Sequence, residues 1–114
     1  MNKEKLLSLI LDSWNKPLVF VDADHIIRYM NEPAKKHYAV WGDCTGKSIF
    51  ACHNENSCAI IDNAYKQLAN GAEEVLFSGS EKQRVYVRGV RDENGKLIGY
   101  YERYEPVCIN QEPE

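Results

Sequence analysis

The chain has 114 residues, a net charge of −3 and 27% charged residues of both signs. This length is enough for one domain with a hydrophobic core of its own. The charge balance argues against nucleic-acid binding, and no apolar run is long enough to span a membrane. The run at residues 6–11 lacks the small-residue cleavage site of a signal peptide, so we expect a cytoplasmic protein. In that compartment its cysteines are expected to be reduced; they are Cys44, Cys52, Cys58 and Cys108.

The first 14 residues predict an amphipathic helix. Its apolar residues recur at helical spacing and form one stripe: Leu6, Leu7, Ile10, Leu11 and Trp14. Leu9 adds apolar surface beside that stripe. The helix either packs on its own domain or also contacts a second copy of the chain. Because symmetric dimers are the commonest oligomers, a homodimer through this helix is one of our two expectations.

Two short strands, Pro17–Val21 and Ile26–Met30, are predicted on either side of a tight turn at residues 22–25. β-Branched and aromatic residues fill both strands, and the aspartates of the turn suit hydrogen bonding to their own backbone. Asn31 follows where the N-cap of a helix belongs. Pro33 then falls in the first helical turn, where a missing N–H costs little.

This stretch resembles the opening of a PAS domain. The family pattern is an aspartate, a turn, an isoleucine, an aromatic residue, an asparagine and an alanine, found here as Asp22, Asp24, Ile26, Tyr29, Asn31 and Ala34. The sequence departs from the pattern at His25, where the family often has Gly. Histidine tolerates a positive φ, so we expect the turn to be kept with some strain. In many PAS proteins the helix before the core makes a dimer contact, as the resemblance implies here.

The helix that begins after Asn31 is expected to form one wall of a cavity and to end at Gly42. It carries Ala34, His37, Tyr38 and Trp41 at helical spacing. The following string, Gly46–Phe50, is similar to one that precedes the next helical segment in PAS-like sequences. It contains Gly-Lys-Ser but lacks the upstream glycine of a phosphate-binding loop, which argues against nucleotide hydrolysis.

Possible metal ligands lie around the start of a helix predicted over Ser57–Asn70. Cys52 and His53 precede this helix, and Cys58 lies in its first turn. The buried stripe of that helix is expected to be Ile60, Ile61, Ala64, Tyr65 and Leu68. Thiolate and imidazole suit zinc or iron, and Cys44 would supply a fourth ligand, although the short Cys-x2-Cys spacing is absent. Alternatively, Cys58 is a redox thiol at a helix N-terminus, or all three are structural residues.

The last third predicts strands around residues 75–77, 85–88 and Leu97–Tyr104. Asn94-Gly95 is a strong hairpin signal between the last two strands, because both residues readily take positive φ. Gly89 and Gly99 on these strands fit either a ligand pocket over the sheet or close packing of a helix. Residues 107–114 are expected to form a flexible acidic tail.

The expected fold is α+β, with a five-stranded antiparallel sheet, helices on one face and the amphipathic helix in front. The strand topology is what the PAS resemblance implies. We expect an N-terminal helix over residues 1–15, a PAS-like domain over 16–106 and the tail. From Gly46 onward the chain is also similar to PAS domains found beside hemerythrin-like domains in anaerobic prokaryotes.

The resemblance implies a sensory module of signal transduction or transcriptional regulation that binds a small ligand, a cofactor or a protein partner and has no catalytic output. Implied ligands are haem, flavin or a small metabolite and, after these, zinc. The residues expected to line the ligand site are Phe20, Tyr29, Tyr38, Trp41, Phe50, Ile61, Tyr65, Val87 and Tyr101. One alternative is a metal or redox sensor built on Cys44, Cys52, His53 and Cys58; another is a ligand-free dimeric interaction module. The flavin-binding motif of light-sensing PAS domains is absent, and so are common enzyme motifs.

Overall fold

The computed structural model describes residues 1–79 and 82–106, apart from the side chains of Trp41 and Cys52. The helices are α1 (Lys3–Ser13), α2 (Glu32–His37) and α3 (Glu55–Ala69), with short 3-10 helices η1 (Ala39–Trp41) and η2 (Ile49–Cys52). The strands are β1 (Val19–Asp22), β2 (Ile27–Met30), β3 (Glu74–Gly79), β4 (Gln83–Arg91) and β5 (Leu97–Pro106). The expected tail, 107–114, lies outside the described residues. None of the helices in the described ranges is long and apolar enough to cross a lipid bilayer.

The five strands form one antiparallel sheet in the order β2-β1-β5-β4-β3. The first and last strands of the chain meet inside the sheet, where β1 pairs with β5 and Phe20 lies opposite Tyr101. The predicted β4–β5 hairpin is present, and Gly95 takes the positive φ, +83°. Asn94 does not take a positive φ; the turn is closed by the hydrogen bond from Gly95 N to the Asp92 carbonyl oxygen at 2.9 Å. This architecture confirms the predicted α+β fold.

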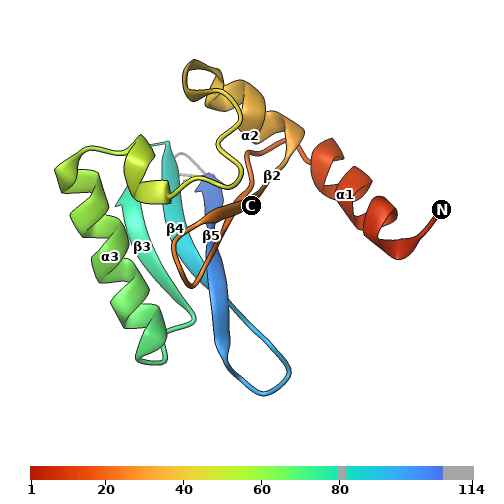
Figure 1. The fold of residues 1–114 in the computed structure, drawn as a ribbon. Coiled ribbons are helices and arrows are strands. Elements are labelled where there is room, and N and C mark those ends of the chain that lie inside the picture. The colour runs from red at the N-terminus through yellow and green to blue at the C-terminus, as the bar shows by residue number, and fades with distance from the viewer. Residues whose placement is uncertain (80–81, 107–114) are drawn as a thin grey trace, which may run out of the picture.

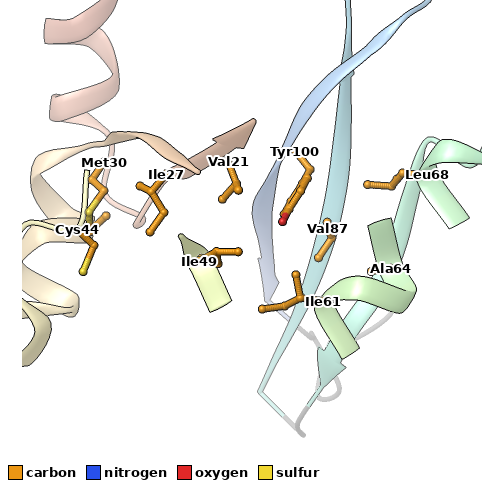
Figure 2. Packing of buried hydrophobic residues seen from close by; sticks show 11 residues of the cluster. Val21, Ile27, Met30, Cys44, Ile49, Ile61, Ala64, Leu68, Val87 and Tyr100 are labelled. Carbon is orange, nitrogen blue, oxygen red and sulfur yellow. The ribbon is translucent and has the colours of Figure 1, made fainter. Parts of the chain in front are cut away.

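The inner face of the sheet carries the core, which α2, η2 and α3 cover. Figure 1 shows α3 running beside β3 and β4, whereas α1 extends away from the sheet. Figure 2 shows the buried residues contributed by both sheet and helices. The cluster comprises Val21, Ile27, Met30, Ala34, Cys44, Ile49, Ile61, Ala64, Leu68, Val87 and Tyr100.

Several element boundaries differ from those predicted. The first strand starts at Val19, two residues after Pro17. The α3 helix starts at Glu55, two residues before the predicted start, because the Asn54 side chain caps it by accepting a hydrogen bond from Ser57 N at 2.8 Å. The helix after Asn31 breaks after His37 into a 3-10 turn, which ends at Gly42 with φ +72°.

The turn between β1 and β2 has the predicted positive φ at His25, +65°. Asp22 holds this turn by accepting hydrogen bonds from Asp24 N (2.9 Å), Ile26 N (3.1 Å) and Arg28 Nε (2.6 Å). The hydrogen bond from Arg28 is the main reason why the pKa of Asp22 is lowered. The ionised Asp22 side chain therefore stabilises the turn through these three hydrogen bonds.

The His25 side chain is anchored in the core although its backbone is strained. Its Nδ1 lies 2.8 Å from Tyr100 Oη, and its ring centroid lies 4.8 Å from Phe50 and 4.7 Å from Tyr65. These contacts offset the cost of positive φ in a residue with a Cβ. The departure from glycine at this position thus adds packing that glycine would lack.

Gly99 serves close packing of two strands. A Cβ on Gly99 would collide with the Val21 carbonyl oxygen and the Phe20 ring, both on the neighbouring strand. Gly89 is similarly crowded, because a Cβ there would lie 3.0 Å from the Leu97 side chain and 3.5 Å from that of Leu68. The expected close packing of a helix therefore fits Gly89, since Leu68 lies on α3, whereas Gly99 is crowded by the neighbouring strand β1.

Most of the apolar stripe of α1 stays exposed. Leu7 and Ile10 are 51% and 53% exposed, and Leu6, Leu9 and Trp14 are also exposed. The side of α1 that faces the domain is that of Leu11 and Asp12, whose carboxylate accepts a hydrogen bond from Tyr29 Oη at 2.8 Å. The helix is thus held to its own domain by one edge.

Asn31 is fully buried and joins α1, β1 and α2. Its Oδ1 accepts hydrogen bonds from Leu18 N (2.8 Å) and Ala34 N (2.9 Å). Its Nδ2 donates to the carbonyl oxygens of Leu11 (2.8 Å) and Lys16 (3.0 Å). The predicted N-cap is confirmed, and the same side chain also fixes the junction between α1 and the sheet.

Asn31→Ala is expected to destabilise the fold by about 2–4 kcal/mol, because it removes four hydrogen bonds and leaves buried backbone groups unpaired. Urea unfolding followed by circular dichroism measures this change. The control is Asn63→Ala on the exposed face of α3, which should change the free energy of unfolding by less than about 0.5 kcal/mol. Equal effects at the two positions would contradict the role given to Asn31.

Candidate ligand-binding site

A cavity of about 240 Å³ lies between the sheet, α2 and η2. We call it the Glu102 cavity; its lining residues are Val19, Ile27, Met30, Tyr38, Cys44, Ile49, His53 and Glu102. Figure 2 shows Ile27, Met30 and Cys44 close together at one end of the core, with Ile49 beside them. Five of the eight lining residues are aliphatic or sulfur-containing, so the walls are mainly apolar.

The local folding of the chain explains how these side chains meet. β1 and β2 pair with Val19 opposite Met30, which places both at the cavity. Asn31 then starts α2 immediately after β2, and Tyr38 stands at the C-cap of that short helix. Ser48 caps η2 by accepting a hydrogen bond from Phe50 N, which sets the helix that carries Ile49. The cavity thus depends on two capped helix starts.

Glu102 is the acidic group of the cavity and lies on β5. Its Oε2 accepts a hydrogen bond from Tyr104 Oη at 3.0 Å, and Tyr104 Oη lies 3.4 Å from Tyr38 Oη. Burial raises the pKa of Glu102, opposed by this hydrogen bond and by the nearby imidazoles of His53 and His37. Burial also raises the pKa of both tyrosines. The carboxyl group is therefore harder to ionise than one in water.

The sulfur and imidazole groups near the cavity make mainly backbone contacts. His53 Nδ1 lies 2.9 Å from the Ile49 carbonyl oxygen. The Cys58 thiol donates to the carbonyl oxygens of Phe50 (3.4 Å) and His53 (3.6 Å), and Cys44 Sγ lies 3.7 Å from the Gly42 oxygen. Such contacts are those of structural thiols.

No group of three or more His, Cys, Asp or Glu side chains able to hold a metal ion occurs within the described residues. Two of the proposed metal ligands, Cys44 and His53, do line the same cavity. The Cys52 side chain lies outside the described part of the chain. The four-residue metal or redox site therefore stays a prediction.

The residues expected to line a ligand site are distributed over several places. Tyr38 lines the Glu102 cavity. Ile61 and Val87 are buried core residues beside a void of about 20 Å³, and Phe50 and Tyr65 pack on His25. The Trp41 side chain is outside the described part of the structure. Whether any of these residues binds a ligand stays a prediction.

The remaining three expected residues, Phe20, Tyr29 and Tyr101, lie on the outer face of the sheet. Together with Leu11, Trp14 and Leu18 they line an apolar groove of about 400 Å³ beside the C-terminal end of α1. We call it the outer groove. It is separate from the Glu102 cavity because side chains of successive strand residues point to opposite faces.

Sequence reasoning missed Glu102 as a cavity residue. The available signal was strand alternation: Tyr100, Glu102 and Tyr104 fall two residues apart and share the face opposite to Tyr101. A carboxylate between two aromatic residues on the inward face of a strand is unusual enough to mark a site. Val19, Ile27 and Met30 were missed because nothing distinguishes cavity-lining aliphatic residues from core residues in a sequence.

Comparison with known proteins identifies the family of this chain. A family model described as "PAS domain" matches residues 7–105. The chain belongs to the PAS domain family. PAS domains are in general sensory, non-catalytic modules, so this chain is a sensory-type domain. No curated protein sequence matches it.

Solved structures share this PAS fold at low sequence identity. The C-terminal domain of a Streptococcus mutans protein superimposes with a TM-score of 0.75 and 24% identity, covering 92% of this chain and 85% of that one. A PAS domain from Colwellia psychrerythraea superimposes with a TM-score of 0.68 and 13% identity, covering 93% of this chain and 98% of that one. A sensory box sensor histidine kinase from Vibrio cholerae superimposes with a TM-score of 0.63 and 19% identity, covering 93% of this chain and 92% of that one. At these identities the likeness shows the fold alone.

Glu102→Gln is expected to change the free energy of unfolding, relative to the parent protein, more favourably at pH 8 than at pH 4. The folded-state pKa of Glu102 is raised, so the stability linked to its proton is complete below the unfolded pKa and is lost as pH rises through the folded pKa. Glutamine keeps the shape without the charge.

Urea midpoints at the two pH values measure this difference. Glu93→Gln, in the exposed β4–β5 turn, is the control for removing one carboxylate. The same stability difference for Glu102→Gln at both pH values would contradict a desolvated carboxyl group at this site.

Proposed function

We propose that this PAS domain is a cytoplasmic sensory module that binds a small ligand in the Glu102 cavity and signals through a homodimer. The observation that carries the proposal is the cavity itself, which combines apolar walls with a few converging polar groups on Tyr38, His53 and Glu102. Ligand sites in proteins typically have this composition. The module has no catalytic output of its own under this proposal.

The size of the cavity supports a small metabolite as the ligand. Its volume of 240 Å³ lies below the range of roughly 300–1,000 Å³ that is typical of sites for drug-sized molecules. A haem or a flavin is at least as large as a drug-sized molecule, so neither fits the cavity in this conformation. A single zinc ion would need ligands beyond Cys44 and His53, because structural zinc sites have four.

The exposed face of α1 and the outer groove support a second copy of this chain as the partner. Leu7 and Ile10 are half exposed on α1, and Leu11 and Trp14 line the groove next to that face. One continuous apolar surface on a helix and an adjacent groove suits a two-fold symmetric contact, in which the same patch serves both subunits. A signalling protein would bind this dimer.

A small apolar probe tests the cavity. An apolar protein cavity of about 150 Å³ is large enough to bind benzene. Benzene should therefore enter the larger Glu102 cavity, shift the methyl NMR signals of Ile27, Met30 and Ile49, and leave those of Ile98 unchanged. Val19→Phe should fill the cavity and abolish the shifts. The matched control is Val40→Phe, which makes the same change at a residue that is 92% exposed. Absence of shifts in the parent protein would refute a ligand cavity.

Charge on the exposed face of α1 tests the dimer. Ile10→Glu should convert a dimer to a monomer, because two symmetry-related carboxylates would be buried in an apolar contact. Light scattering coupled to size-exclusion chromatography measures the mass. Leu9→Glu is the matched control: Leu9 is also exposed but lies off the stripe, so this variant should remain dimeric. A monomeric parent at high concentration would refute the proposal.

A further inference from the structure

We propose that the ligand of the Glu102 cavity is a small organic ammonium cation whose charged head binds the Glu102 carboxylate and whose hydrocarbon part lies on the aliphatic walls. This inference rests on the proposed function, since it names the chemical class of the ligand for the same cavity. It follows from the charge, the hydrogen bonding and the size of the site.

The cavity offers an acidic group without a lysine or arginine partner. Glu102 is the one acidic residue among the eight lining residues, and none of the eight is Lys or Arg. Two other partly buried carboxylates of the sheet have arginine partners: Glu74 has Arg103 at 2.9 Å and Arg88 at 3.2 Å, and Asp22 has Arg28 at 2.6 Å. Glu102 takes part in none of the ion pairs among the described residues. A cationic ligand would supply the missing charge.

The carboxylate also has unused hydrogen-bonding capacity. Among the described residues only Tyr104 donates to it, through Oε2. An ionised carboxylate can accept about four hydrogen bonds. No fully buried side-chain oxygen in the described part of the chain lacks a partner, so Oε1, to which no described residue donates, is not fully enclosed. An ammonium group carries up to three N–H donors and suits this acceptor.

The walls favour a cation that carries a short hydrocarbon chain. Val19, Ile27 and Ile49 present aliphatic surface, and the Tyr38 ring adds a face that attracts cations. The volume of 240 Å³ corresponds to about eight water molecules. Pentylammonium, with six heavy atoms, is therefore a suitable probe. A carboxylate ligand would meet Glu102 as a like charge, and a neutral alcohol would leave that charge unbalanced.

The groups that face Glu102 set the pH dependence of binding. They are Tyr104 on β5, His37 at the end of α2, Tyr38 at the C-cap of that helix, and His53 after η2. Pentylammonium should bind more tightly as pH rises from 5 to 8, because Glu102 loses its proton and its carboxylate then carries the charge that the ammonium group binds. Burial raises the pKa of Glu102, which moves this change toward neutral pH.

Isothermal titration of the full chain with pentylammonium, 1-pentanol and pentanoate tests the inference. The parent should bind pentylammonium about tenfold or more tightly than 1-pentanol, as expected for a charge-assisted hydrogen bond in an apolar site. Glu102→Gln should remove that preference, so that this variant binds pentylammonium no more tightly than 1-pentanol. Glu93→Gln, which alters an exposed carboxylate, should keep the preference.

The outcomes separate this inference from the proposed function. Equal binding of pentylammonium and 1-pentanol by the parent, or an unchanged preference in Glu102→Gln, would overturn the ammonium assignment and leave the cavity as a ligand site. Failure of all three probes together with failure of benzene would overturn both. If Glu102→Gln does not fold, the preference in the parent and its rise between pH 5 and 8 decide the question.

Discussion

The hydrogen bonds of one buried amide hold this PAS domain together at the point where its parts meet. Asn31 caps α2 through Ala34 N, fixes the entry to β1 through Leu18 N, and binds the end of α1 through the Leu11 carbonyl oxygen. A buried side chain with four partners cannot move without breaking several of them at once. The orientation of α1 and the position of α2 are therefore set by the same residue.

The Glu102 cavity exists because α2 is short and is followed by a 3-10 turn. Asn31 starts α2, and the helix ends at His37, so that Tyr38 lies over β5 near Tyr104 and Glu102. The proposed ligand would thus contact the wall formed at the end of α2, and Asn31 joins the first turn of that helix to α1 by hydrogen bonds. Under this proposal the binding site and the dimer helix share a rigid hydrogen-bonded junction, which is a direct physical connection between the two.

The two faces of the sheet have different roles because β5 alternates. Tyr100 and Glu102 face inward to the core and the cavity, whereas Tyr101 lies in the outer groove opposite Phe20. Gly99 leaves the space on β5 that the Phe20 ring occupies. Aromatic residues that look equivalent in the chain are in this way divided between a core, a cavity and an exposed groove.

Local chemistry in the sequence was enough to predict the Asn31 cap, the positive φ at His25 and the β4–β5 hairpin, because each depends on neighbouring residues. The strand topology of the PAS fold was predicted from the family resemblance. The start of α3 was placed two residues late, since the Asn54 cap was not recognised. The candidate site was largely beyond the sequence: of nine residues expected to line it, only Tyr38 reaches the Glu102 cavity in the described structure. A cavity is space left between side chains from distant segments. Strand pairing and the length of α2 decide which of them face it, and those depend on the whole fold.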